Sequence, residues 1–574
     1  MVDRGASPGA VVLVIALALN ACAPGALRSQ SGVDVVQVNQ SQANQNRPLT
    51  VVLRAEPKAL NTKLNASTTM AALQGGVPRL FNAYLAITDE REVPHPYLVE
   101  SLPALKTDSW RVFPDGQMET TYRLRPNLTW QDGRPLAAQD FVFGLQVITD
   151  PQVGTRLFKV TAEPYIEEFV AADERTIVIR WRKPYLDADA LGGEWALPRH
   201  ILEEAFQRGD PDAFVDRPYW TREYLGLGPY KLDRWEPGAY IEGAAFSGHA
   251  LGPPKIQRVR IIFGGDGNTV LTYLLAGAAD FVESTTLALQ FQQGLILKRG
   301  WDGTVLLEPS QIRYIQIQQR PNYTNPREIL DLRVRKALLH ATDRQALVDA
   351  LLEGFSQIAH ATISPLVDFY PDVERVVARY PYDVRRTEQL MAEAGLSKGG
   401  DGSYVTPSGA QFSPQLRATS GSSGSQEEAE QAVLVDFWRR AGVAVQPAVL
   451  PVAQTNDGET TSTFPAFVNG SMAIGATLVK FRSDYIPSPE TRWTGSNRGG
   501  YSNVEYDRLA HLADATLDRT ERGQFVVQMM KIVSEDLPGL PLYYSVGVSA
   551  FAVGLHGPVQ GGSTWNVHEW EWGI

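Results

Sequence analysis

The residues of this chain that could act as nucleophiles do not stand in the surroundings that catalysis requires. The pattern Gly-x-Ser-x-Gly, whose serine attacks acyl carbons in many hydrolases, occurs at 5–9 and again at 395–399. Such a serine sits on a sharp turn between a strand and a helix. The first copy lies beside an N-terminal apolar segment, and the second follows a predicted helix. We therefore interpret Ser397 as part of a loop and not as a nucleophile.

Other residue patterns that carry chemistry are also missing. The eight histidines are dispersed, and none belongs to an HExxH pair or to a zinc pattern with cysteine. The Gly-rich "GGDGN", at 264–268, matches neither a P-loop nor a dinucleotide fingerprint. Carboxylates are plentiful, but their spacing in the sequence cannot distinguish a catalytic pair, such as that of a glycosidase, from acidic residues on a solvent-exposed surface. The sequence therefore predicts no catalytic residue, no metal site and no cofactor, and an exported hydrolase stays as an alternative.

The single cysteine among the 574 residues, Cys22, comes directly after an apolar segment. That segment, "VVLVIALAL" at 11–19, is shorter than the roughly 20 apolar residues that span a bilayer, which is typical of a signal peptide. "LNAC", at 19–22, resembles the lipobox of bacterial lipoproteins, whose cysteine is lipidated. Attached acyl chains would supply the double anchor that stable membrane attachment needs. We expect a lipidated Cys22 after a cleaved leader, with ordinary secretion or a buried thiol as the alternatives.

Composition limits the class of protein further. The segment 23–48 is rich in Gln, Asn, Ser and Gly, so it cannot bury enough apolar surface to fold and is predicted to be a flexible tether. A net charge of −11 with no basic cluster argues against a nucleic-acid partner. One cysteine allows no intrachain disulfide, and the length implies more than one folded lobe.

Strand and helix patterns alternate through the rest of the chain. "IQRVRIIF", at 256–263, predicts a strand, 268–280 predicts a helix, and the apolar "FV" after it predicts another strand. Longer helices are predicted at 331–354 and 427–442, where apolar residues recur at helical spacing. This alternation favours mixed α/β lobes at both ends of the chain.

Six segments carry a family resemblance, among them "TYRLRPNLTWQDGRPLAAQDFVF" at 121–143 and "GLGPYKLDRWEPGAYI" at 226–241. In their order along the chain they resemble the periplasmic solute-binding proteins of ABC transporters, in their oligopeptide, dipeptide and nickel-binding class. The segment 121–143 has that class's strand, its Trp-x-Asp-Gly-x-Pro turn ("WQDGRP") and its following helix with an aspartate. "GLGPY", at 226–230, resembles its Gly-Thr-Gly-Pro-Tyr segment, with Leu227 in place of threonine. The other four segments are 268–282, 331–354, 501–515 and 536–544.

The resemblance implies a two-lobed, hinged clamshell of α/β class with an extra α+β domain on the first lobe. A ligand that touches both lobes would stabilise the closed state, which a permease then recognises. The implied division is a signal peptide at 1–21, a tether at 22–48, lobe I at 49–87, 218–308 and 545–574, the extra domain at 88–217, and lobe II at 309–544.

One loop of the family suggests a ligand contact. In peptide-binding members a carboxylate of lobe II holds the terminal amine of the peptide, and "FRSDYIPSP", at 481–489, resembles the loop that carries it. Asp484 is then the candidate partner of a ligand ammonium. Ser488 replaces a common acidic residue, and Arg482 offers Asp484 another partner, so a turn cap or an internal ion pair is the alternative. The candidate pocket aromatics are Phe481, Tyr485 and Trp493, for which core packing is the alternative.

The resemblance therefore predicts a monomeric, lipid-anchored receptor outside the cytoplasm, in a periplasm or on the outer face of the cell membrane. It would bind a peptide-like solute, deliver it to ABC permease subunits and perform no chemistry on it. A non-peptide cargo on the same fold, such as an oligosaccharide, a metal chelate or another small metabolite, is the nearest alternative. A sensory receptor that signals to a membrane partner is a further one.

Overall fold

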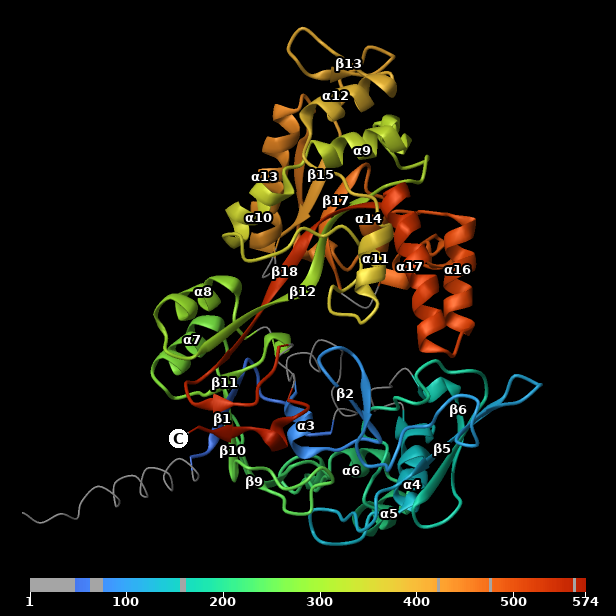
Figure 1. Ribbon diagram of the computed structural model, residues 1–574, viewed down its shortest axis with the longest axis vertical. Helices are drawn as coiled ribbons and strands as arrows, with labels where there is room; N and C mark the ends of the chain where they lie inside the picture. The colour runs from blue at the N-terminus through green and yellow to red at the C-terminus, as the bar shows by residue number, and fades with distance from the viewer. Residues whose placement is uncertain are drawn as a thin grey trace, which may run out of the picture.

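A computed structural model describes residues 47–61, 76–154, 162–286, 288–420, 424–473, 477–560 and 564–573 (Figure 1). The predicted signal peptide, Cys22 and all but the end of the predicted tether lie outside these residues, so cleavage and lipidation stay predictions. Within the described ranges, no helix is both long and apolar enough to cross a membrane.

One large mixed sheet runs through the whole molecule. Two long strands, β12 (Thr304–Ile317) and β18 (Gly539–Phe551), lie side by side and pass from its lower to its upper part in Figure 1. Their register shifts between Pro309 and Ile312, because proline has no N–H to donate to the ladder. The strand order is β16 (Gln446–Leu450), β15 (Gln415–Thr419), β17 (Phe467–Ala473), β12, β18, β11 (Phe281–Val282), β1 (Leu49–Leu53), β10 (Arg258–Phe263), β9 (Tyr240–Ala245) and β8 (Tyr230–Glu236).

The lower part, here called lobe I, holds β1, β8–β11 and the C-terminal half of β18. Its central strands β1 and β11 are almost wholly apolar, as expected for strands that are covered on both faces. The predicted helix at 268–280 is α7 (Gly267–Leu275), which Asp266 caps by accepting from the Asn268 and Thr269 amides. It ends earlier than predicted because Gly277 has a φ of +67°. Among the described residues, lobe I also contains the helices α3 (Val77–Phe81) and α8 (Phe291–Gly300).

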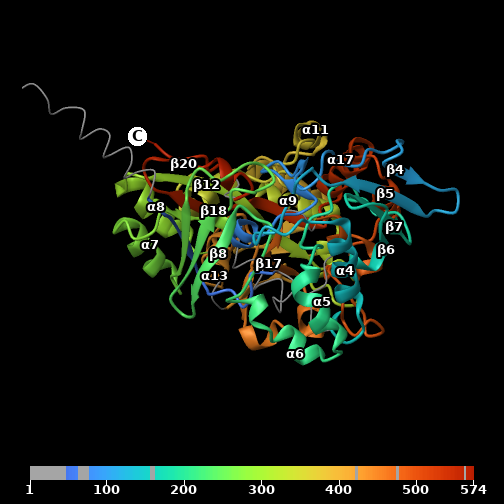
Figure 2. The same cartoon turned by 90° about the horizontal axis from the view of Figure 1, so that it is seen from below.

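The extra domain is built on a four-stranded antiparallel sheet. Figure 2 shows this sheet at the side of the molecule opposite α7 and α8. The Trp-x-Asp-Gly-x-Pro turn leads into its first helix: Gly133 takes a φ of +87°, and Trp130 Nε1 donates to Asp140, which caps that helix. Its elements are β4 (Trp110–Val112), β5 (Met118–Arg123), β7 (Thr176–Trp181), β6 (Ile166–Ala171), α4 (Ala138–Thr149), α5 (Arg199–Gln207) and α6 (Pro211–Val215).

Lobe I and the extra domain share one core. Trp181 and Phe141 of the extra domain belong to the same apolar cluster as Leu49 and Val51 of β1. Lobe I and the extra domain therefore pack as one body.

The upper part, lobe II, has a core on each side of its sheet. One core is covered by α9 (Leu332–His340), α10 (Arg344–Leu352), α12 (Val384–Glu393) and α13 (Gly424–Arg440). The other is covered by α11 (Tyr370–Val376), α16 (Val504–Ala515) and α17 (Arg519–Asp536). The single helix predicted at 331–354 is two helices, because Asp343 caps α10 by accepting from the Ala346 amide.

Several shorter elements complete the fold. The predicted division points between 308 and 309 and between 544 and 545 fall inside β12 and β18, and the domain boundaries stay predictions. The short elements are β2 (Ala86–Thr88), β3 (Pro94–Pro96), β13 (Ser397–Lys398), β14 (Tyr404–Val405), α14 (Gly458–Ser462), α15 (Thr477–Lys480), β19 (Leu555–His556) and β20 (Glu571–Trp572).

Candidate functional site

The carboxyl ends of the parallel strands in the two lobes point toward each other. In lobe II, β17 runs antiparallel to β12 and ends at Ala473, opposite Gln311 in the middle of β12. In lobe I, β11 runs antiparallel to β18 and ends at Val282, opposite Ala550. In open α/β sheets, ligands bind outside the carboxyl ends of the strands. The region between the lobes, beside the middle of β12 and β18, is therefore the candidate ligand site.

Two buried carboxylates lie at this edge of lobe I. Glu283 follows β11 and is 6% exposed, and its Oε2 accepts from the Gly76 amide at 2.6 Å. Its Oε1 accepts from the Thr285 hydroxyl at 2.8 Å, and burial raises the pKa of Glu283 to about 7. Glu308 of β12 is also buried and accepts from the Ser284 hydroxyl at 3.4 Å. Lobe I therefore has two buried glutamates at the predicted ligand edge, and the pKa of one of them, Glu283, is raised by burial.

A buried ion pair lies at the same edge of lobe II. Arg313 Nε of β12 donates to Glu430 Oε2 of α13 at 2.8 Å, and the Tyr543 hydroxyl of β18 donates to the same oxygen at 3.2 Å. Both charged residues are buried, and burial raises the pKa of Glu430 although the Arg313 guanidinium opposes that shift. Since β12 and β18 are the strands that join the lobes, this pair fixes α13 to the connection between them.

Asp484, the predicted partner of a ligand amine, is paired within the chain. Arg482 Nε donates to its Oδ1 at 3.0 Å and Arg482 Nη2 to its Oδ2 at 2.6 Å. Arg482 also donates to Asp514, and its hydrogen bond to Asp484 lowers the pKa of that carboxyl. The internal ion pair, which was the alternative for Asp484, is thus present. Its carboxyl is still half exposed, and its role toward a ligand stays a prediction.

The structure does not gather the three candidate aromatics in one pocket wall. Phe481 is 3% exposed, and its ring packs edge-on against Tyr501 and Tyr506 in the core of lobe II. Tyr485 is 38% exposed and lies under the Arg482 guanidinium, and Trp493 is half-buried against Tyr323. Phe481 therefore packs in the core, which was the alternative to a ligand contact. Ligand contacts by Tyr485 and Trp493 stay predictions.

Sequence reasoning missed the charged residues at the strand ends. Glu283 had a usable signal, because it directly follows the apolar strand "FV" at 281–282. Arg313 and Glu430 had none, because 117 residues separate them and only the strand order brings them together.

The residues examined for catalysis do not form a catalytic arrangement. Ser397 was predicted in a loop, but it lies in the two-residue strand β13; this strand follows α12 and leads into a turn, so the strand–helix elbow is absent there. His249 is held by the Tyr97 hydroxyl at 2.8 Å and the Gly252 carbonyl oxygen at 2.7 Å. Across the described part of the chain, no three His, Cys, Asp or Glu side chains are grouped as metal ligands would be.

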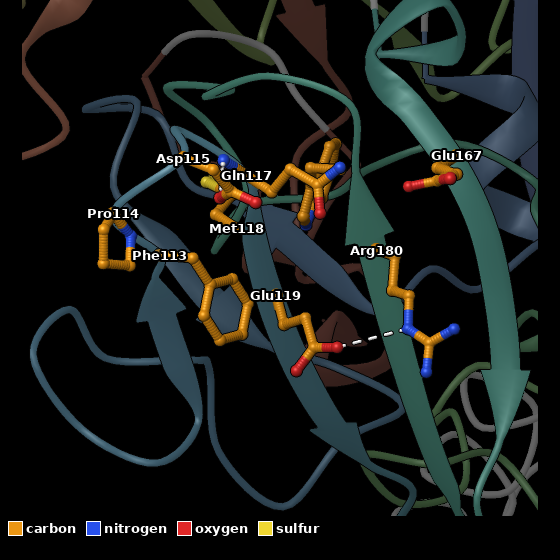
Figure 3. A pocket seen from close by; sticks show the side chains of 9 residues that line it. Phe113, Pro114, Asp115, Gln117, Met118, Glu119, Glu167 and Arg180 are labelled. Carbon is orange, nitrogen blue, oxygen red and sulfur yellow. Dashed lines mark hydrogen bonds and ion pairs between the residues drawn. The ribbon is translucent and has the colours of Figure 1, made fainter.

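A hollow of about 580 Å³ lies on the sheet of the extra domain (Figure 3). Phe113 and Glu119 line it from the β4–β5 hairpin, and Arg180 lines it from β7. Arg180 Nε donates to Glu119 at 3.2 Å, as the dashed line in Figure 3 shows, so these two charges compensate each other. Because the hollow lies on the extra domain and not at the strand ends, we do not assign the ligand to it.

Comparison with known proteins places the chain in a family. A family model for the bacterial extracellular solute-binding proteins, family 5 Middle, matches residues 100–484. The oligopeptide-binding protein AppA of Bacillus subtilis is 24% identical over 557 residues, which are 95% of this chain and 94% of that protein. Heme-binding protein A of Haemophilus influenzae is 25% identical over 477 residues, which are 80% and 81% of the two chains.

A solved structure shares the fold. The crystal structure of NikZ from Campylobacter jejuni in complex with Ni(L-His) matches with a TM-score of 0.63 at 21% identity. The match covers 92% of this chain and 99% of NikZ.

Proposed function

The chain belongs to family 5 of the bacterial extracellular solute-binding proteins, and we propose that it is a lipid-anchored receptor that delivers a peptide-like ligand to an ABC permease. The family sets its location outside the cytoplasm and its role as a solute receptor. The peptide cargo, the lipid anchor on Cys22 and the monomeric state are the parts that we add.

The facing strand ends are the observation that carries this proposal. A ligand between Val282 and Ala473 would touch both lobes, and β12 and β18 form the connection about which the lobes would move. Contacts with both lobes give the ligand a higher affinity for the closed state, which is how it shifts the equilibrium toward closure. A permease that recognises closure then needs no direct contact with the cargo.

The peptide assignment is supported by the relative that matches 95% of this chain, which is named an oligopeptide-binding protein. The alternative, a non-peptide cargo such as a metal chelate or another small metabolite, is supported by the relatives named for heme and for Ni(L-His). Both use the same fold, so the cargo has to be measured.

Mass spectrometry of the natively purified full chain, after denaturation to release its ligand, separates these alternatives. A ladder of short peptides would support the peptide assignment. One defined non-peptide mass would overturn it and leave the receptor role intact. An empty chain would be screened by thermal shift, where a ligand at 100 times its Kd adds about 2.7 kcal/mol of stability.

Globomycin, which blocks lipoprotein signal peptidases, tests the lipid anchor. If the amount of precursor does not rise in treated cells, lipidation of Cys22 is contradicted.

A further inference from the structure

Lobe II contains a second cavity, of about 450 Å³, at the start of α10. Its apolar wall is formed mainly by Ile358, Tyr380, Pro381 and Tyr382. The opposite end of α10 faces lobe I, because Glu353 there binds Arg299 of α8 (Figure 1). The cavity therefore lies on the side of α10 away from lobe I and is separate from the region between the lobes. Its volume falls in the range of small-molecule sites.

A buried cation lies beneath this cavity. Arg344 is 4% exposed, and its guanidinium donates to the carbonyl oxygens of Ala359 at 2.7 Å, Tyr380 at 2.8 Å and Pro541 at 3.2 Å. Arg344 and Tyr380 line the cavity, and Ala359 lies between the lining residues Ile358 and His360, so the charge lies at the cavity wall. Within the described part of the chain, Arg344 makes no ion pair with a carboxylate. Carbonyl dipoles satisfy its N–H groups but leave its net charge uncompensated.

Two further basic side chains line the same cavity. His360 Nδ1 is buried and has no hydrogen-bond partner, whereas a buried ring nitrogen ordinarily has one. Burial, together with Arg344 and Arg379, lowers the pKa of His360 to about 4, so its ring is neutral near pH 7. Arg379 lines the cavity and is exposed, and it forms no ion pair with any residue that the structure describes. A single carboxylate, that of Asp343, is in the lining, and it accepts from the Ala346 amide at 2.9 Å to cap α10.

We propose that this cavity is a second binding site, for a small organic anion that carries a carboxylate on an aromatic or aliphatic body. The body packs against Tyr380 and Tyr382, and the carboxylate accepts from Arg379 and from Nδ1–H of His360, above the Arg344 charge. This ligand satisfies the unpaired nitrogen and compensates the buried cation at once. The site is independent of the cargo between the lobes.

Benzoate and its neutral isostere benzamide test this site by equilibrium dialysis with the full chain. We expect saturable benzoate binding at one site and roughly tenfold weaker binding of benzamide, which corresponds to the loss of one charge-assisted interaction. Arg379→Gln and His360→Phe should each weaken benzoate binding by roughly fivefold or more. Arg375→Gln is the matched control, because Arg375 is exposed on α11, pairs with Asp372 and lies outside the cavity lining.

Three results would overturn the proposal: no saturation up to about 10 mM benzoate, far above the affinity of a built site; equal binding of benzamide; or equal losses in all three variants. Arg379 is exposed, so its substitution tests the site even if His360→Phe fails to fold. A cargo recovered from between the lobes should remain bound when benzoate is added. Its displacement would place benzoate in that region and also overturn the proposal.

Discussion

Arg522, in the first half of α17, reaches from lobe II to the extra domain: its Nη2 lies 3.7 Å from Asp187 Oδ1, and its Nη1 donates to the Leu186 carbonyl oxygen at 3.5 Å. The two partners of that hydrogen bond are 336 residues apart. Leu517, in the turn before α17, packs against the core shared by lobe I and the extra domain. Lobe II therefore contacts the body formed by lobe I and the extra domain at a place apart from β12, β18 and the Arg299–Glu353 pair.

Loss of this contact should favour the open arrangement of the lobes. We expect Arg522→Gln to increase the radius of gyration of the ligand-free chain in small-angle scattering, and to weaken the affinity for the recovered cargo by roughly two- to fivefold. That range corresponds to about 0.4–1 kcal/mol, which lies within the about 0.2–1 kcal/mol of an exposed ion pair. The difference should shrink in about 0.5 M NaCl, because salt screens exposed charges.

Arg508→Gln is the control for this experiment, because Arg508 pairs with Glu505 on its own helix α16. Reversal of both charges, Arg522→Asp with Asp187→Arg, should restore part of the lost affinity. Equal behaviour of Arg522→Gln and Arg508→Gln would contradict a role of Arg522 in closure.

Asp484→Asn tests the predicted amine contact against the ion pair. If a ligand ammonium shares this half-exposed carboxylate with Arg482, the substitution should weaken peptide binding about tenfold, or about 1.4 kcal/mol, in calorimetric titration. Asp514→Asn is the matched control, since Asp514 also binds Arg482 but lies outside the loop that resembles the family's amine site. Equal losses in both variants would show that only the Arg482 network matters.

Substitution at the Arg313–Glu430 pair should change stability strongly. Glu430→Gln leaves the buried Arg313 guanidinium with only the more distant Glu427 carboxylate, at 3.8 Å, as its counter-charge. The free energy of unfolding in urea should therefore fall by up to about 3–5 kcal/mol. The double variant Arg313→Met, Glu430→Leu should recover most of this loss, because it removes both charges. Glu428→Gln, on an exposed position of the same helix, should have little effect. Destabilisation by the double variant as large as that by Glu430→Gln would contradict this account.

The raised pKa of Glu283 predicts a pH dependence of stability. The folded chain keeps the proton up to about pH 7, whereas the unfolded chain releases it near the usual value of 4.5. The folded state therefore binds more protons in this window, and the free energy of unfolding should fall as pH rises from about 4.5 to 7, by about 3 kcal/mol.

Urea unfolding of the chain and of Glu283→Gln at several pH values would measure this contribution. The difference between the two curves should appear within that window and level off above it. Parallel curves would mean that Glu283 titrates alike in the folded and unfolded states.

Local sequence signals predicted much of the fold. The Trp-x-Asp-Gly-x-Pro turn was visible because Asp-Gly is a local turn signal, and Gly133 takes the positive φ that such a turn needs. The helix predicted at 427–442 corresponds to α13. The split at Asp343 was missed, because both halves keep the same apolar spacing and only the cap separates them.

The candidate site was predicted less well than the fold. The pairing of Asp484 with Arg482 could be anticipated because a single residue separates them. The partners Arg313 and Glu430 could not, since their meeting depends on the order of strands that are remote in sequence.

The position of β18 in the sheet has a consequence for how the chain folds during its synthesis. This strand is made late in synthesis, yet it lies between β12 and β11 and joins the two halves of the sheet. The early strand β1 pairs on one side with β11, and β11 in turn pairs with β18. A nascent chain that has not yet reached Gly539 thus lacks the strand that joins the two halves of the sheet, so the ten-stranded sheet can be completed only after almost all of the chain has been made.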